Sequence, residues 1–364
     1  MKIVYLYSSL AIMGGVERVL VDKMNYLVSH GYEVYIITAD QGQHPVSYRV
    51  DERIQLYDLQ IRFHSQYQYN GWQRLIEGRR LSRLYLQRLR EKLEIIKPDV
   101  IVCTTSQNVR GLLRIKGSIP LIVESHVNFT HPDSWHHHIR TLYNNYWIGK
   151  AEAVVTLTQG DARNWRRVSR NVHVIPNIVH LNDAGRYSDC TKKRAIFVGR
   201  LVEQKGIPDL IKVWQIVNQR YPDWLLDVFG DGQMDSMPEI QLFVHPPTKN
   251  IMEEYINSSM LLMTSVYEPF GLVLPEAMSC GLPVVAFDCP YGPADIIEHE
   301  KNGFLVERRN VHSFANDICK LIDNIELRQS MGQQGIVMAQ QYQANMIMPQ
   351  WQHLFSDLTS KELF

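Results

Sequence analysis

The strongest constraint on the fold is a repeated alternation of short apolar runs with segments of helical periodicity. The chain opens with an apolar run at residues 3–7, and a Ser/Gly-rich turn ending at Gly14-Gly15 follows. Apolar side chains then recur at helical spacing up to Gly31, before a second apolar run at 32–38. Strands that alternate with helices pair in parallel and need a helical layer on each face. The sequence therefore predicts an α/β fold built on parallel sheets.

The alternation runs twice along the chain. Further strands are predicted in the first half at residues 100–103, 121–124, 153–157 and 172–175. After a polar stretch at 182–193, strands are predicted at 195–198, 225–229, 260–264 and 284–287. A chain of 364 residues is longer than one hydrophobic core usually supports. We therefore predict two doubly wound, Rossmann-like domains at residues 1–180 and 181–344, and a C-terminal helix at 345–364 that crosses back to the first domain. Because such sheets bind ligands at the carboxyl ends of their strands, we expect the domains to face each other across a cleft.

Charge is unevenly distributed, although the chain is neutral overall. Residues 1–180 hold 23 basic and 15 acidic side chains, so the first half carries a net charge of +8 and the rest −8. Part of this excess lies in Trp72–Lys92, where seven cations accompany an apolar stripe at helical spacing. A basic amphipathic helix can lie on an anionic membrane surface; the alternative is the solvated face of a packed helix. No nucleic-acid recognition motif accompanies these cations, so no nucleic-acid partner is expected.

The chain gives no sign of a secretory or metal-dependent protein. Five cysteines without a C-x-x-C pair, and an N-terminus unlike a signal peptide, lead us to expect a cytoplasmic location. No apolar run approaches the roughly 18 residues of a membrane span, so we expect any membrane contact to be peripheral, on the inner face. The chain has no D-x-D motif, and the side chains of His136–His138 would point in different directions on a helix. We therefore expect neither a metal nor a cofactor.

Two cations in the second half stand where a phosphate group could bind. Arg200 follows a predicted strand, and Lys205-Gly206 precedes a predicted helix. A guanidinium, an ammonium and a helix N-terminus all bind phosphate oxygens. The alternative interpretation is a pair of solvated cations beside a turn.

Two carboxylates follow, on either side of an apolar segment. Glu268 and Glu276 flank Phe270-Gly271-Leu272. Pro275 is tolerated near a helix start, which places Glu276 in the first turn of a helix. Such a pair can hold hydroxyl groups of a polyol at two separated points, and backbone N–H groups near Gly271 can reach phosphate oxygens. The alternative is a surface glutamate and a glutamate that stabilises a helix dipole.

The first half offers two less specific candidates. Gly14-Gly15 at a strand-to-helix turn would let a ligand approach the backbone, as at many other turns. His126 follows a predicted strand, where it would be either a hydrogen-bond partner of a ligand or a half-buried histidine satisfied by backbone groups.

The order and spacing of these motifs resemble the retaining GT-B glycosyltransferases of family 4. G-R-x-x-x-x-K-G is followed by E-P-F-G-L-x-x-x-E-A-M-x-C-G-x-P-V-V, and the opening Gly14-Gly15-x-Glu17-Arg18 fits as well. The run Gly292-Pro293-x-Asp295-Ile296-Ile297 is similar to the subgroup that assembles bacterial exopolysaccharide and capsule.

The resemblance assigns a role to each candidate of the second half. It implies that Arg200 and Lys205 bind the diphosphate of a nucleotide-sugar and that Glu276 holds the ribose. Glu268 would contact the donor sugar's hydroxyl groups together with the Phe270–Leu272 backbone.

The resemblance also implies a reaction. A sugar of the galactose or N-acetylgalactosamine type would pass with retention from a UDP-linked donor to a hydroxyl of a glycan or polyprenyl-linked acceptor in surface polysaccharide assembly. His126 and Gly14-Gly15 would approach the donor from the first domain. Negative charge develops on the departing diphosphate, where Arg200 and Lys205 would stabilise it. The predicted catalytic residues are Arg200, Lys205, His126 and Glu268. Attack from the leaving-group side needs no side-chain nucleophile, whereas double displacement needs a carboxylate near the anomeric carbon. The alternative functions are a nucleotide-sugar epimerase and a non-catalytic partner that binds sugar nucleotides.

Overall fold

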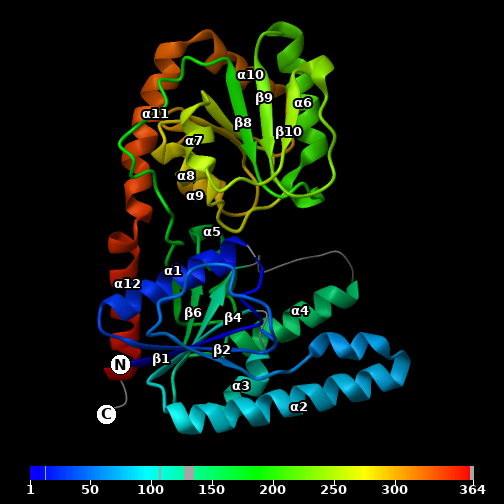
Figure 1. The fold of residues 1–364 in the computed structure, drawn as a ribbon, viewed down its shortest axis with the longest axis vertical. Helices are drawn as coiled ribbons and strands as arrows, with labels where there is room; N and C mark the ends of the chain where they lie inside the picture. The colour runs from blue at the N-terminus through cyan, green and yellow to red at the C-terminus, as the bar shows by residue number, and fades with distance from the viewer. Residues whose placement is uncertain (13, 106–107, 127–134, 361–364) are drawn as a thin grey trace. The chain divides into compact units, whose positions relative to one another are not determined.

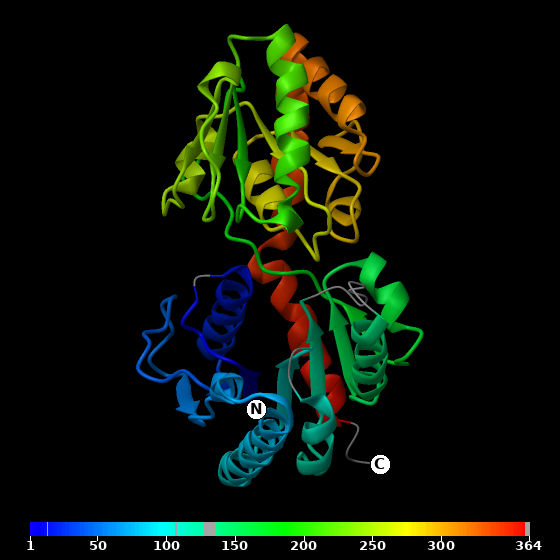
Figure 2. The ribbon, with the colours of Figure 1, turned by 90° about the vertical axis from the view of Figure 1, so that its right-hand side faces the viewer.

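The computed structural model describes residues 1–12, 14–105, 108–126 and 135–360. The chain divides into two compact units, each a parallel sheet with helices packed on it (Figures 1 and 2). The first unit comprises Met1–Leu157, Asp161–Ile178 and the residues from Met348 onward, and the second comprises Thr158–Gly160 and Val179–Ile347.

The first unit contains a seven-stranded parallel sheet in the order β3-β2-β1-β4-β5-β6-β7. Its strands are β1 (Lys2–Tyr7), β2 (Glu33–Thr38), β3 (Gln55–Asp58), β4 (Val100–Thr104), β5 (Leu121–Ser125), β6 (Ala153–Thr156) and β7 (Val172–Val174). Its helices are α1 (Gly15–Ser29), η1 (Phe63–Gln68), α2 (Gly71–Ile96), α3 (Val109–Ile115), α4 (Trp135–Ile148), α5 (Gln159–Trp165) and the final α12 (Ala344–Ser360), which starts in the second unit.

Helices cover both faces of this sheet. Leu89 of α2 and Leu112 of α3 pack in the same core cluster as Val4 of β1. Successive side chains of a strand point to opposite faces, so Tyr5 points away from that cluster. On Tyr5's side lie α1 and α12, where the Lys23 ammonium of α1 lies 4.5 Å from the centre of the Trp351 ring of α12.

Helix α2 belongs to the core over its C-terminal part only. Leu81, Tyr85 and Leu89 are buried, whereas Trp72 is 79% exposed and Leu75 is 44% exposed. The apolar stripe predicted for Trp72–Lys92 is therefore divided into a packed part and a part that faces solvent. None of the helices in the described ranges combines the length and apolar character needed to cross a membrane.

The second unit contains a six-stranded parallel sheet in the order β10-β9-β8-β11-β12-β13. Its strands are β8 (Arg194–Val198), β9 (Leu225–Phe229), β10 (Leu242–His245), β11 (Met260–Met263), β12 (Val284–Phe287) and β13 (Gly303–Val306). Its helices are η2 (Glu203–Lys205), α6 (Ile207–Arg220), η3 (Pro238–Ile240), α7 (Ile251–Ile256), α8 (Val273–Ser279), α9 (Pro293–Ile296), α10 (Val311–Asp323), α11 (Ile325–Ala339) and η4 (Gln340–Tyr342). Helices α6 and α10 pack in one core cluster with β8 and β12, through Trp214, Phe314, Phe197 and Phe287.

The predicted fold class of two parallel-sheet, Rossmann-like domains is confirmed. The prediction was incomplete at the sheet edges, because β3, β10 and β13 were missed. Each of these strands lies at the edge of its sheet, and all four residues of β3 are at least partly exposed. An edge strand has one neighbour only and needs no continuous apolar run, which explains why no apolar run marks β3. Strands β10 and β13 do contain apolar runs, at residues 242–244 and 304–306, and the sequence analysis did not assign them to strands.

Candidate functional site

The strand order of the second sheet reverses between β8 and β11, which is where an open parallel sheet binds its ligand. The loop after β8 leads from Gly199 to Gly206, and the loop after β11 leads from Thr264 to Glu268. The phosphate-binding candidates and the first carboxylate of the sequence therefore come from the two strands that flank the reversal point. Lys205 and Glu268 lie 63 positions apart in sequence but meet there.

Lys205 and Glu268 form an ion pair at this point. Their side chains are only 15% and 11% exposed. Glu268 also accepts a hydrogen bond from the Ser265 hydroxyl at 3.2 Å, and the Thr264 hydroxyl donates to the Lys205 backbone carbonyl at 3.0 Å. The pair thus presents an ammonium and a carboxylate side by side on a hydrogen-bonded loop, and each group is partly accessible to a ligand.

Gly206 makes this close approach possible. Its φ of +67° lies in the left-handed region that favours glycine. A Cβ at Gly206 would lie 1.9 Å from the Thr264 carbonyl oxygen, a distance that no other residue tolerates. A side chain here would therefore push the Lys205 loop away from the loop that carries Glu268.

The segment after Glu268 turns into a short helix. Phe270 is 3% exposed, and its ring packs edge-on against Tyr342 at 5.4 Å between ring centres, so the ring is not available to a ligand. Gly271 has a φ of +95°, and α8 begins two residues later. Glu276 lies in the first turn of α8, which confirms its predicted position, and it is 6% exposed.

Arg200 differs from Lys205 in its surroundings. It is exposed, and within the described ranges it forms no ion pair. The nearby Cys289 has no role as a nucleophile at neutral pH, because burial, reinforced by the Glu268 carboxylate, raises the pKa of its thiol to about 12.

In the first unit, His126 belongs to a buried charge cluster with Lys23 and Glu124. The Lys23 ammonium donates to one oxygen of Glu124, and Nε2 of His126 lies 2.6 Å from the other. All three side chains are at most 7% exposed. Burial would raise the pKa of Glu124, but Lys23 and His126 together lower it to about 2. Among the described residues, the partner of His126 is thus a carboxylate, and the sequence analysis proposed no role for Glu124 or Lys23.

Gly14 and Gly15 stand at the start of α1. Gly14 is the N-cap residue, and Gly15 is the first residue of the helix. A Cβ at Gly14 would lie 2.2 Å from Oε2 of Glu17, whose other carboxylate oxygen, Oε1, accepts a hydrogen bond of 2.9 Å from the Tyr7 hydroxyl. Burial, followed by the charge of Glu17, raises the pKa of Tyr7. Glycine at position 14 therefore leaves room for the folded-back glutamate.

Comparison with known proteins identifies the activity of the chain. The family described as Glycosyl transferases group 1 matches residues 186–338, and Glycosyltransferase Family 4 matches residues 13–183. The chain is a glycosyltransferase. An uncharacterized glycosyltransferase of Haemophilus influenzae is 28% identical over 96% of this chain and 98% of its own length. The amylovoran biosynthesis glycosyltransferase AmsD of Erwinia amylovora is 27% identical over 98% and 99%.

The fold of this glycosyltransferase is shared by TarM of S. aureus, whose structure holds UDP. That structure covers 97% of this chain and 99% of its own at 17% identity, with a TM-score of 0.77. The likeness to such structures supports the GT-B architecture predicted from the sequence.

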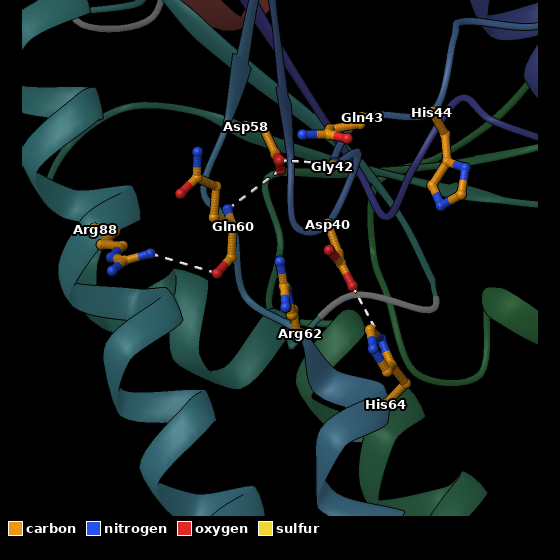
Figure 3. Close-up of a pocket in the computed structure, with 9 residues that line it drawn as sticks. All are labelled: Asp40, Gly42, Gln43, His44, Asp58, Gln60, Arg62, His64 and Arg88. Atoms are coloured by element: carbon orange, nitrogen blue, oxygen red, sulfur yellow. Dashed lines mark hydrogen bonds and ion pairs between the residues drawn. The ribbon is translucent and has the colours of Figure 1, made fainter.

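The first unit of the glycosyltransferase also contains a polar pocket that sequence reasoning missed (Figure 3). It lies at the carboxyl ends of β2 and β3 and has a volume of about 910 Å³. Asp58 shapes its wall by accepting hydrogen bonds from the backbone N–H groups of Gly42 and Gln60, at 2.9 and 3.2 Å. Asp40 and His64 approach to 3.1 Å on the far side (Figure 3). A second hollow shares these two residues and extends to Ser8 and Asn108, near the point between β1 and β4 where the first sheet reverses.

No metal site emerges from the described part of the chain, where no three His, Cys, Asp or Glu side chains are grouped to hold an ion. The backbone of His136–His138 lies in α4, and the side chains of these residues fall outside the described part.

Proposed function

We propose that this glycosyltransferase transfers a sugar with retention from a UDP-linked donor to a hydroxyl of a glycan or lipid-linked acceptor during polysaccharide synthesis. The observation that carries the proposal is the Lys205–Glu268 pair at the reversal point of the second sheet. The complex of TarM with UDP and the amylovoran pathway of AmsD support the donor and the product class.

In this proposal the second unit binds the donor. Arg200 and Lys205 contact the diphosphate, and Glu276 holds the ribose. Glu268 binds hydroxyl groups of the donor sugar, and the Phe270–Leu272 backbone assists it. Arg200 is exposed and carries no partner charge in the described ranges, so it is available to an incoming diphosphate. Lys205 is held in place by Glu268 before the donor arrives, which limits the entropy lost on binding.

The first unit contributes Gly14, Gly15 and His126 in this proposal. Because Nε2 of His126 bonds to Glu124, Nδ1 is the ring nitrogen that we assign to the donor. Glu124 thereby fixes the ring orientation, and Lys23 keeps Glu124 ionised.

For retention we propose attack from the leaving-group side, with a phosphate oxygen accepting the acceptor's proton. The anomeric configuration of the product, measured by proton NMR, tests this directly. Retention of the donor's α configuration supports the proposal, and a β product contradicts it. A donor screen should place UDP-linked sugars, of the galactose or N-acetylgalactosamine type, first.

Replacement of Lys205 tests the donor site. Lys205→Ala should reduce donor turnover by about 10²–10³-fold, because it removes a cation that stabilises the departing diphosphate. The matched control is Lys212→Ala, an exposed lysine on α6 that lies outside the site and should leave turnover unchanged. Near-normal turnover in Lys205→Ala would remove the proposed role.

We further propose that the first unit docks peripherally on the inner, anionic face of the membrane through Trp72–Lys92. The exposed start of α2, including Trp72 and Leu75, supports contact with lipid. Sedimentation with vesicles is the check: equal binding to anionic and neutral vesicles would contradict the proposal.

A further inference from the structure

Five arginines line one groove in the first unit, between η1, α2 and α3. They are Arg74, Arg79, Arg83, Arg110 and Arg114. The groove has a volume of about 900 Å³, and all five side chains are exposed. The sequence analysis placed three of them on a basic helix. It did not foresee that α3 would bring two more to the same hollow.

Close helix packing creates this convergence. Gly111 of α3 faces Leu86 of α2, and a Cβ at Gly111 would lie 2.8 Å from the Leu86 methyl groups. Because Gly111 has no side chain, α3 can approach α2 closely. Arg110 and Arg114 flank this contact, so the contact sets them beside the arginines of α2.

The arginines repel one another, and the described part of the chain provides no carboxylate paired with them. Arg79 and Arg83 are four residues apart on α2, and Arg110 and Arg114 are four residues apart on α3. Like charges at this spacing destabilise a helix. Within the described ranges none of these four forms an ion pair, whereas Arg80, beside Arg79, is paired with Glu77 at 2.7 Å outside the groove. The positive charge of the groove therefore favours the binding of an anion.

Two of the arginines are held by aromatic side chains. The Arg74 guanidinium lies 4.3 Å from the centre of the Tyr67 ring, and that of Arg110 lies 5.2 Å from the Trp147 ring and also donates to the Tyr143 hydroxyl. Planar guanidinium groups held in place in this way bind phosphate oxygens in pairs. Apolar Leu75 lines the same groove, and the 79% exposed Trp72 stands one turn before it on α2.

We propose that this groove binds the diphosphate of a prenyl-linked acceptor, with the isoprenoid chain against the exposed start of α2. The proposal rests on the proposed transferase function, whose acceptor it narrows to one class. A diphosphate carries the charge that several arginines require, and the adjacent apolar side chains fit a chain attached to it. The neighbouring hollow shares Ser82 and Asn108 with the groove, which leaves space for the acceptor's sugar beside its diphosphate.

The test is calorimetric titration of the full chain with geranyl diphosphate in the presence of saturating UDP, so that the diphosphate cannot bind at Arg200 and Lys205. The double variant Arg79→Gln/Arg83→Gln should weaken geranyl diphosphate binding about 100-fold, since each charge-assisted contact contributes about tenfold or more. The matched control, Arg80→Gln/Arg90→Gln, removes the same charge from the same helix outside the groove and should bind normally. Thermal melting of both variants confirms that they are folded.

Further arms separate the possible ligands. Geranyl diphosphate should bind more tightly than inorganic pyrophosphate, and binding should weaken with salt. Absence of geranyl diphosphate binding, or equal loss in both double variants, would overturn the proposal. So would a wild-type chain that binds phosphatidylglycerol vesicles but not geranyl diphosphate, because the arginines would then serve only the membrane surface. Failure of UDP itself to bind would count against the donor site, whereas normal UDP binding without geranyl diphosphate binding would count against the groove alone.

Discussion

Replacement of Lys23 by methionine should destabilise the first unit strongly, because the substitution strands a buried carboxylate. Lys23 and Glu124 are each 3% exposed, and His126 would be the remaining partner of Glu124 that we identify. Removing one member of a buried ion pair costs about 3–5 kcal/mol. The pKa values of the pair show the same dependence on each other: burial would raise the pKa of Glu124, but Lys23 and His126 lower it, whereas burial lowers the pKa of Lys23 despite the Glu124 carboxylate.

Hydrogen exchange measured by mass spectrometry is suited to this prediction, because it reports on β5 and α1 without averaging over the second unit. Peptides from these elements should exchange at least about 100-fold faster in Lys23→Met than in the wild type. The double variant Lys23→Met/Glu124→Gln should recover part of the loss, since no buried charge remains unpaired. Exchange in Lys23→Met within a factor of five of the wild type would refute the reasoning. So would a double variant whose loss of stability is the sum of the losses of Lys23→Met and Glu124→Gln.

Three further predictions concern other parts of the molecule. Burial would raise the pKa of Glu124, but Lys23 and His126 lower it to about 2. The contribution of the Glu124 carboxylate to folding stability, present above about pH 4.5, should therefore be lost as pH falls toward 2. An acid titration of stability should show this loss in the wild type and not in Glu124→Gln. Gly206→Ala should destabilise the second unit by about 2 kcal/mol or more, seen as a lower melting temperature, because of its φ of +67° and the 1.9 Å approach to Thr264. Cys289 should resist iodoacetamide at pH 8 in the folded chain and react once unfolded, since burial and Glu268 raise its pKa to about 12.

The central strands of both sheets were predictable because burial on two faces leaves a visible mark in the sequence. Strands β9 and β12 were predicted with the bounds that the structure gives them. Their neighbours on both sides favour apolar residues, and only Asp227 of β9, which is paired with Arg194 of β8, interrupts the two runs. The strand β3 escaped because it is stabilised through one edge only and is at least partly exposed throughout. The position of β3 in the sheet depends on its pairing with β2, and no local sequence pattern encodes that pairing.

The site was predictable as motifs but not as contacts. The residue types at Lys205 and Glu268 indicated phosphate and hydroxyl binding, yet their ion pair follows from the order of β8 and β11 in the sheet. A signal for the cluster around His126 was present and overlooked. Lys23 falls on the apolar face of α1, between Leu20 and Leu27, and a cation there requires a buried partner.

The Lys23–Glu124 and Lys205–Glu268 ion pairs differ in exposure, and this difference assigns them different functions. Both occupy positions where well-packed apolar side chains would serve stability as well or better, so their presence requires another explanation. The Lys23–Glu124 pair, at 3% exposure on each side, is sealed from solvent and can act only through His126, whose ring it orients. The Lys205–Glu268 pair is 15% and 11% exposed, so a phosphate can reach the ammonium and a hydroxyl can reach the carboxylate. Of these two pairs, only Lys205 and Glu268 can separate from each other and contact a substrate instead. Substitutions at Lys23 should therefore change stability first, whereas those at Lys205 should change donor turnover first.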